Sequence, residues 1–158
     1  MNDFIFRPAL AGDLEALVDF NARLAMETEH RVLNLDLLRP GVAAVLADAG
    51  KGSYFVAENR EEVVGQLLLT FEWSDWRNGR FWWIQSVYVK SEFRGRGALR
   101  GLFGHVRELA RLEKNVCGLR LYVEKENLTA QQAYEKLGLS RTPYEVFEAD
   151  FVYGTAAP

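Results

Sequence analysis

Apolar and polar residues recur along the chain with two periods, one typical of strands and one of helices. Residues 4–8 follow the pattern of a short strand. After them, Asp13 precedes a stretch in which Leu14, Leu17 and Val18 recur with the spacing of one helix face. The beginning of the chain therefore predicts a strand followed by an amphipathic helix.

The rest of the chain continues this mixture. The expected elements are a helix over 35–49, strands over 54–58, 63–73 and 80–89, a helix over 97–114, a strand over 119–124, a helix over 128–137 and a strand over 144–153. Pro40 lacks the N–H that a helix interior needs, so the first of these helices either continues or divides into a turn and a shorter helix. A hairpin around 59–62 indicates antiparallel pairing, and Gly138 is placed to end the last helix with a positive φ. The order predicts a mixed α/β (α+β) fold with a central mixed, mostly antiparallel sheet flanked by helices.

Length and composition indicate one folded domain. The chain has 158 residues and 18.0 kDa, which suits a single domain over residues 1–153 followed by a flexible tail over 154–158. A hydrophobic content of 49% and an aromatic content of 13% provide a core and leave apolar surface for a ligand or a partner subunit, so a homodimer is compatible with the sequence.

Charge and hydropathy narrow the classes of partner. A net charge of −3 speaks against a nucleic-acid-binding protein, which needs clustered Lys and Arg. No apolar run approaches the roughly 20 residues that span a bilayer, and Asp3 stands where a signal peptide would be basic. The single cysteine, Cys117, agrees with a reducing compartment. We therefore expect a cytoplasmic protein that binds neither nucleic acid nor membrane.

A glycine-rich turn follows the apolar stretch 84–89 and precedes the helix over 97–114. Glycines in Arg94-Gly95-Arg96-Gly97-Ala98 let the backbone present several N–H groups to one anion, at the positive end of a helix. Arg94, Arg96 and Arg100 add positive charge. A dinucleotide-binding turn would follow the first strand of a βαβ unit, and a Walker loop would carry Gly-Lys-Ser/Thr, so neither fits. A tight strand-to-helix connection without a ligand is the simpler alternative.

This region resembles the acyl-CoA site of the GNAT N-acyltransferase superfamily. The resemblance rests on Val87-Tyr88-Val89-x-x-x-x-Arg94-Gly95-Arg96-Gly97, beside the family signature Arg/Gln-x-x-Gly-x-Gly/Ala, and on the order of the predicted elements. It implies that strand residues 87–89 pair with the pantetheine arm and that the N–H groups of the turn hold the pyrophosphate. The implied coenzyme-binding residues are Val87, Tyr88, Val89, Arg94, Gly95, Arg96, Gly97, Ala98, Leu99 and Arg100. Leu99 departs from the signature, which has Gly or Ala there.

A second part of the resemblance lies in Asn127 and Tyr134. Their separation is close to two helical turns, so both lie on one side of the predicted helix. The resemblance implies that Asn127 contacts acetyl-CoA and that Tyr134 lies near the thioester sulfur, where it protonates the leaving thiolate. The alternatives are a helix N-cap for Asn127 and a packed aromatic for Tyr134.

The implied reaction is direct attack of an amine on a thioester, which needs a base and an acceptor site. Glu72, at a strand end, is the first candidate for the base, with Glu124 and Tyr122 as alternatives. The mixture of acids and indoles around Asp75 and Trp76 suits a cationic amine. Further candidates for acceptor binding are Glu27 and Gln85.

The acceptor region faintly resembles the diamine and polyamine branch of GNAT. That branch has Glu-Asp where this chain has Gln85-Ser86, so its base is missing here. No metal is expected, because His30, His105 and Cys117 lie outside any cluster with metal-ligand spacing. The sequence predicts an acetyl-CoA-dependent N-acetyltransferase that acts on a primary amine of a small molecule or peptide. The alternative is a non-catalytic acyl-CoA-binding or regulatory domain.

Overall fold

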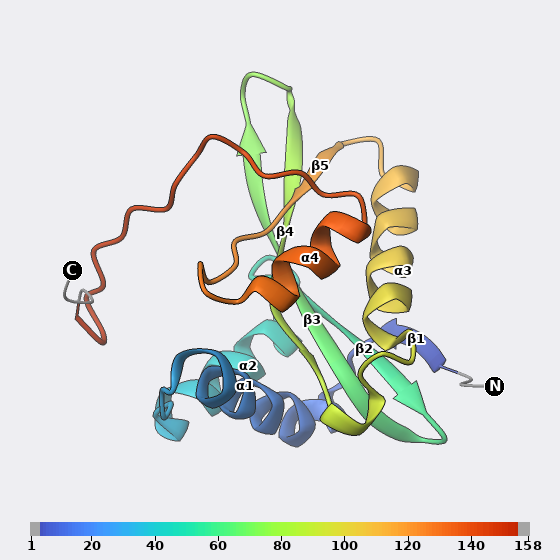
Figure 1. The fold of residues 1–158 in the computed structure, drawn as a ribbon, viewed down its shortest axis with the longest axis vertical. Helices are drawn as coiled ribbons and strands as arrows, with labels where there is room; N and C mark the ends of the chain where they lie inside the picture. Colours follow the sequence, from blue (N-terminus) through green and yellow to red (C-terminus); the bar gives the residue numbers. More distant parts are fainter. Residues whose placement is uncertain (1–3, 155–158) are drawn as a thin grey trace. The chain divides into compact units, whose positions relative to one another are not determined.

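The computed structural model describes residues 4–154, which fall into two compact units divided between Leu121 and Tyr122. The first unit carries the sheet and the second carries one helix with the C-terminal segment (Figure 1). The flexible tail predicted over 154–158 lies outside the described residues, apart from Gly154. The single domain over 1–153 stays a prediction.

A five-stranded sheet forms the centre of the first unit. Its strands lie in sequence order, β1 (Phe4–Pro8), β2 (Ser53–Asn59), β3 (Glu62–Ser74), β4 (Gly79–Val89) and β5 (Val116–Arg120). Neighbours from β1 to β4 pair antiparallel, and β5 runs parallel to β4. The predicted mixed, mostly antiparallel sheet is confirmed, as is the β2–β3 hairpin, whose Arg60 and Glu61 take the two positive φ angles of a type I′ turn.

The helices also begin and end close to the predicted positions. They are α1 (Leu14–Glu29), α2 (Leu35–Ala47), α3 (Ala98–Leu112) and α4 (Leu128–Lys136), with short 3₁₀ turns at Ala11–Asp13 and Ser91–Phe93. Of the two alternatives for Pro40, the structure shows the continuous helix: α2 begins at an Asn34 cap and passes through the proline. Gly138 follows α4 with a φ of 90°, as predicted.

The helices of the first unit cover both faces of the sheet. Successive strand residues point to opposite faces: the Tyr54 hydroxyl of β2 meets Asn21 of α1, whereas the neighbouring Phe55 ring lies 5.6 Å from the His105 ring of α3. One apolar cluster joins α1, α2 and β2 through Leu17, Val18, Val42, Tyr54 and Val56. The helices α1 and α2 therefore share one face, and α3 packs on the other (Figure 1).

Two predicted strands differ from the structure. Residues 144–153 form no strand, and within the described residues Asp150 instead accepts the N–H groups of Val152 and Tyr153 in a local turn. The strand predicted over 119–124 lies earlier, at Val116–Arg120, where β4 offers it a partner. Both differences concern strand pairing, because an alternating pattern of side chains forms a strand only where a neighbouring strand offers hydrogen bonds.

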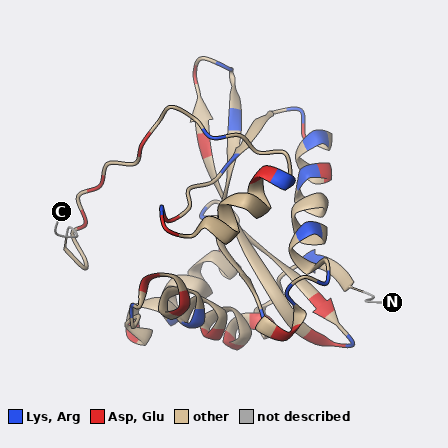
Figure 2. Ribbon diagram, in the orientation of Figure 1, with Lys and Arg blue, Asp and Glu red and all other residues tan. Residues whose placement is uncertain are grey.

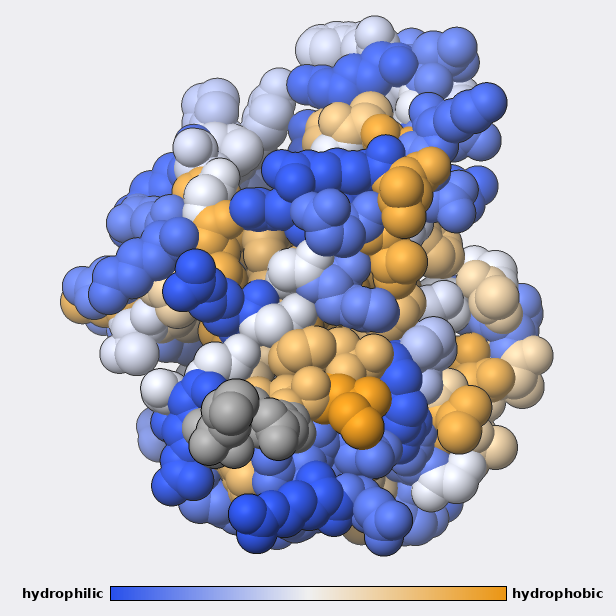
Figure 3. Space-filling view, turned by 90° about the vertical axis from the view of Figure 1, so that its right-hand side faces the viewer, coloured by the Kyte–Doolittle hydropathy of each residue, from blue (hydrophilic) through white to orange (hydrophobic). Residues whose placement is uncertain are grey.

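Charged residues are distributed unevenly over the first unit. Figure 2 shows Lys and Arg along α3 and acidic residues on α1. The side that carries α3 in Figure 1 is mostly hydrophilic, with smaller apolar patches between the charges (Figure 3). None of the helices described over residues 4–154 is long and apolar enough to cross a membrane.

We expect Gly101→Ala and Gly104→Ala, both in α3, to change stability in opposite directions. A Cβ at Gly101 would overlap the Phe6 ring of β1, whereas a Cβ at Gly104 meets no atom within 4 Å. Gly101→Ala should lower the free energy of unfolding by about 1–3 kcal/mol. Gly104→Ala should raise it by up to about 1 kcal/mol because alanine favours the helix. Urea unfolding measures both, and equal effects would contradict the close approach of α3 and β1.

An ion triplet around Arg7 makes stability depend on pH. Arg7 pairs with Asp13 at 2.8 Å and with Glu58 at 2.8 Å, joining β1, the start of α1 and β2. The Arg7 guanidinium lowers the pKa of Asp13 below its ordinary value of 3.8. The pair's contribution is therefore present above about pH 4 and is lost as the pH falls through the lower pKa of the folded state.

Asp13→Asn should accordingly lower the melting temperature at pH 7, and the difference from the wild type should shrink towards pH 2. The matched control is Asp19→Asn, which removes the same charge from the exposed Asp19–Arg23 pair and should have little effect. A difference that is constant between pH 7 and pH 2 would refute this assignment. Thermal unfolding followed by circular dichroism gives both curves.

Candidate coenzyme site

A β-bulge interrupts β4 just before the glycine turn. Gln66 of β3 pairs with Tyr88 and Leu68 pairs with Gln85, so β4 holds one extra residue over this stretch. Ser86 lies within the bulge and has a φ of 50°, in the left-handed region. Beyond this, β5 pairs with β4 only between Arg80 and Trp83. In the part of the chain that the structure describes, the last residues of β4 therefore have no strand pairing on the β5 side.

Buried polar side chains form hydrogen bonds in and around the bulge. The Gln66 side chain is fully buried, and its Nε2 donates to the Ser86 carbonyl at 3.0 Å. Asn21 of α1 donates to the Tyr54 hydroxyl at 3.2 Å. Burial raises the pKa of Tyr54, and its hydrogen bonds with Asn21 and Ser86 oppose this rise. These contacts link three strands and α1 to the bulge.

Gln66 and Asn21 were not among the site residues predicted from the sequence. A signal was present, because Gln66 stands alone among the apolar residues 63–69 of a strand. Its Oε1 atom is buried and has no hydrogen-bond partner among the described residues. Such an atom is rare in a folded protein and marks the place where the regular ladder is broken.

The glycine turn has the geometry of an anion site. Gly95 and Gly97 have φ angles of 71° and 97°, and a Cβ on either would meet no atom within 4 Å, so the conformation and not the space requires glycine. The first bond of α3 runs from the Gly101 N–H to the Gly97 carbonyl at 2.8 Å. The three preceding N–H groups, of residues 98–100, thus have no partner within the helix. They point out of the positive end of a helix of 15 residues.

The side chains of this turn are divided between core and surface. Ala98 is buried, Leu99 is half-buried and Arg100 is exposed. The Leu99 side chain is therefore neither fully enclosed in the core nor fully exposed to solvent.

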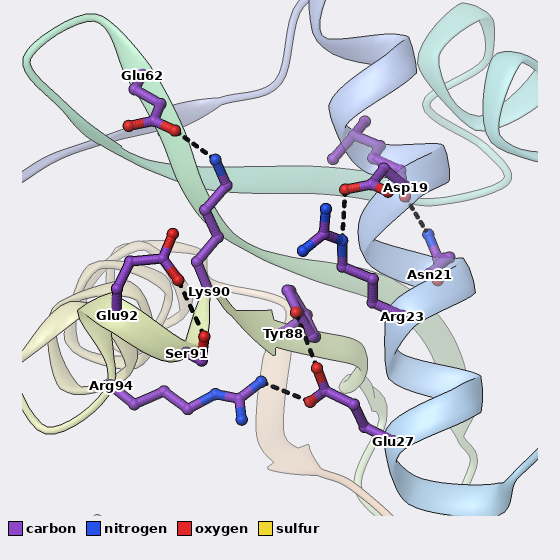
Figure 4. A network of polar contacts seen from close by, with 11 residues as sticks. Asp19, Asn21, Arg23, Glu27, Glu62, Tyr88, Lys90, Ser91, Glu92 and Arg94 are labelled. Atoms are coloured by element: carbon purple, nitrogen blue, oxygen red, sulfur yellow. Dashed lines mark hydrogen bonds and ion pairs between the residues drawn. The ribbon is translucent and has the colours of Figure 1, made fainter.

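Arg94 and Tyr88 both bind the end of α1 through Glu27 (Figure 4). Arg94 Nη2 donates to Glu27 Oε2 at 2.6 Å, and the Tyr88 hydroxyl donates to Glu27 Oε1 at 3.1 Å. Arg94 Nε also donates to the Val89 carbonyl at 2.8 Å. Burial and the neighbouring Glu27 carboxylate raise the pKa of Tyr88. Glu27, predicted for the acceptor site, therefore lies against the coenzyme signature.

The first candidate for the base, Glu72, and three of the four acceptor candidates lie along the β3–β4 hairpin. Glu72 accepts hydrogen bonds from Trp83 Nε1 at 3.2 Å and from Arg120 Nη1 at 2.8 Å. Gln85 donates to Thr70 Oγ1 at 2.6 Å. Gln85 pairs opposite Leu68, and Glu72 lies four positions further along β3. Glu72 and Gln85 are therefore separated by roughly 13 Å along the strands.

The remaining hairpin candidates lie in the connecting turn. Asp75 Oδ1 accepts the Trp76 N–H at 2.9 Å, and the Trp76 side chain is 86% exposed. The indole is therefore available to a ligand, whereas the Asp75 carboxylate also serves the turn itself.

Asn127 and Tyr134 belong to the second unit. Asn127 caps α4, since its Oδ1 accepts the Ala130 N–H at 3.1 Å, so the N-cap alternative describes its side-chain oxygen. Tyr134 is half-buried on α4, and burial raises the pKa of its hydroxyl. The two alternative bases also lie in this unit: Glu124 accepts the Glu126 N–H at 2.7 Å, and Tyr122 is 61% exposed.

The two histidines and the cysteine occupy positions that packing and a helix end account for. His105 packs between the Phe6 and Phe55 rings, and His30 ends α1 with a φ of 52°. Cys117 is half-buried in β5. Over residues 4–154, no three His, Cys, Asp or Glu side chains are grouped so as to hold a metal ion. The absence of a metal in the working protein stays a prediction.

Comparison with known proteins connects this geometry to a family. The model of the acetyltransferase (GNAT) family matches residues 21–139. Thialysine N-epsilon-acetyltransferase of Bos taurus is 40% identical over 76 residues, which are 48% of this chain and only 44% of that protein. Ribosomal-protein-alanine N-acetyltransferase from Brucella melitensis biovar Abortus 2308 shares the fold, with a TM-score of 0.76 over 94% of this chain and 99% of that one at 15% identity.

A further solved structure is similar over nearly the whole chain. It is that of a possible acetyltransferase from Clostridium difficile 630, with 43% identity and a TM-score of 0.87 over 95% of this chain and 99% of that one. The family model covers three quarters of the sequence, including the bulged strand and the glycine turn. The chain therefore belongs to the GNAT acetyltransferase family.

Proposed function

We propose that the protein transfers an acetyl group from acetyl-CoA to a primary amine by direct attack. The observation that carries this proposal is the glycine turn, with its left-handed residues and unpaired helical N–H groups, directly after a bulged strand. A diphosphate suits these donors, because backbone N–H groups and the helix dipole both favour negative charge. Coenzyme binding in this family supports the same assignment.

The edge of β4 that is not paired with β5 provides main-chain donors for the thioester. Main-chain N–H groups between 84 and 89 that lack a β5 partner can bind the pantetheine arm and stabilise the oxyanion formed at the thioester carbonyl. The amine nitrogen forms a bond to the carbonyl carbon, and the carbon–sulfur bond then breaks. The leaving thiolate takes a proton from an acid, and the attacking nitrogen, which carries a positive charge after bond formation, loses a proton to a base to give the neutral amide.

Tyr134 is our candidate for the acid. A pKa raised by burial keeps its hydroxyl protonated at neutral pH, so a proton is available for the thiolate. Asn127 is assigned to coenzyme binding through its amide nitrogen, because its oxygen already caps α4.

Glu72 remains the first candidate for the base, beside Glu124 and Tyr122. Trp83 and Arg120 hold the Glu72 carboxylate in one orientation, which is a requirement for a positioned base. We assign acceptor binding to Glu27, Asp75, Trp76 and Gln85. The exposed Trp76 indole suits a cationic amine through cation–π contact.

The bovine relative is named for acetylating the ε-nitrogen of thialysine, and this supports a small amine as the acceptor. We place the protein in the cytoplasm without nucleic-acid or membrane partners, and a homodimer is consistent with its apolar surface. The exposed residues Phe147 and Phe151 contribute to that surface.

An acetylation assay separates the enzyme from the alternative of a non-catalytic acyl-CoA-binding or regulatory domain. That alternative is favoured by Leu99 at the last signature position. Protein, acetyl-CoA and a panel of small amines, polyamines and peptides are mixed, and free thiol is followed. We expect thiol release above buffer with at least one cationic amine. Measurable coenzyme binding without release from any amine would favour the binding domain.

Tyr134→Phe tests the assignment of the acid. Loss of the hydroxyl should lower kcat by about 100-fold, since general acid catalysis contributes that much or more. The dissociation constant for CoA should change by less than about twofold, because the ring is retained. The matched control is Tyr144→Phe, an exposed tyrosine of the same unit, which should leave kcat unchanged. Unchanged turnover in Tyr134→Phe would remove this residue as the acid.

A further inference from the structure

Glu27 occupies the last turn of α1 and uses both carboxylate oxygens on the coenzyme signature. Oε1 accepts the Tyr88 hydroxyl and Oε2 accepts Arg94 Nη2. In Figure 4 the two side chains converge on Glu27 from the end of β4 and from the turn that follows it. The contacts span 61 and 67 residues of sequence, so Glu27 connects α1 to the coenzyme signature directly.

Arg94 is held at three points. Its Nε donates to the Val89 carbonyl, its Nη2 binds Glu27, and its guanidinium lies 5.3 Å from the centre of the Tyr88 ring. Val89 ends β4 and Arg94 begins the glycine turn, so the Nε bond closes the short connection between them. The planar Arg94 guanidinium therefore contacts the main chain of β4 through Nε and helix α1 through Nη2.

The electrostatics of this pair affect an anion in the turn. Glu27 and Arg94 are 42% and 47% exposed, so as a surface pair they add little to overall stability. Their charges nevertheless offset each other beside the N–H groups of Gly95 to Arg100. Removing Arg94 alone would leave the Glu27 carboxylate uncompensated close to a bound diphosphate.

We infer that Glu27 is a positioning residue for coenzyme binding. It holds Arg94 against the end of β4 and so fixes the orientation of the turn, while the main-chain N–H groups and not the Arg94 guanidinium form the anion site. This role rests on the proposed function, because it requires that the turn binds CoA. It adds to Glu27 a task distinct from acceptor binding.

The test is isothermal titration of CoA into the wild type and variants of the full chain. Glu27→Gln should weaken binding by up to about fivefold, the upper end of what one exposed ion pair provides. Arg94→Ala should weaken it further, and the double variant Glu27→Gln/Arg94→Ala should bind at least as well as Arg94→Ala alone. This non-additivity is the signature of two residues that act as a unit.

Glu29→Gln is the matched control. Glu29 belongs to the same helix end and pairs with Arg31 at 3.7 Å, so its loss removes the same charge without touching the signature, and CoA affinity should not change. In steady-state assays with the best amine of the panel, Glu27→Gln should raise the KM for acetyl-CoA, whereas Glu29→Gln should leave this KM unchanged. Thermal unfolding of every variant checks that the fold is retained.

Several outcomes would overturn the inference. Unchanged or tighter CoA binding by Glu27→Gln would show that Arg94 is free to reach the diphosphate, and strictly additive losses would show that the two residues act separately. A kcat loss without a change in CoA affinity would assign Glu27 to the acceptor alone. In these cases the wild type still binds CoA and the proposed function stands. A folded wild type that binds no CoA would reject both.

Discussion

A strand that is hydrogen-bonded on both edges has no main-chain donors left for a ligand. The first unit meets this constraint by ending the β4–β5 pairing at Trp83 and Arg120. The bulge at Ser86 then adds one residue to β4, changes its course and brings it to the glycine turn. The proposed binding of a coenzyme by backbone groups depends on this early end of pairing, because a regular five-stranded ladder would have used the same N–H groups internally.

Breaking a ladder costs free energy, and the core around the bulge shows what offsets it. A non-glycine residue with positive φ is strained, and a buried polar atom without a hydrogen-bond partner also costs free energy. Gln66 gives the Ser86 carbonyl a donor, while Tyr54 connects Ser86 to Asn21 on α1. Helix α1 thus supports the bulge from within the core through Asn21 and contacts the turn at its own C-terminal end through Glu27.

The sequence predicted well those features that depend on local conformation. Helix and strand order followed from side-chain periodicity, and the strand-to-helix turn followed from Gly95 and Gly97, which the structure places at positive φ. The apolar–polar periodicity of a strand does not reveal one extra residue in it, so the bulge and Gln66 were not predicted. It also cannot report pairing, which is why 144–153 was predicted as a strand.

The structure adds contacts between residues far apart in sequence. Glu27 was predicted for acceptor binding, which stays a prediction, and the structure shows that the contacts that hold its carboxylate come from β4 and the turn, more than 60 residues away. Glu72 was selected for its place on a strand, and only the structure shows its ion pair with Arg120. Such partners are set by tertiary packing, which spacing along one segment does not determine.

Two neighbouring glycines at the start of α3 limit substitution for different reasons. At Gly97 a side chain would meet no atom within 4 Å, and the restriction comes from its positive φ. A D-amino acid would adopt this φ without strain, whereas an L-amino acid other than glycine is strained there. At Gly101 the backbone is ordinary helix, and the restriction is the volume taken by Phe6. Variation at Gly101 can therefore be accommodated by a smaller partner on β1, whereas no change elsewhere in the chain relieves the chirality requirement at Gly97.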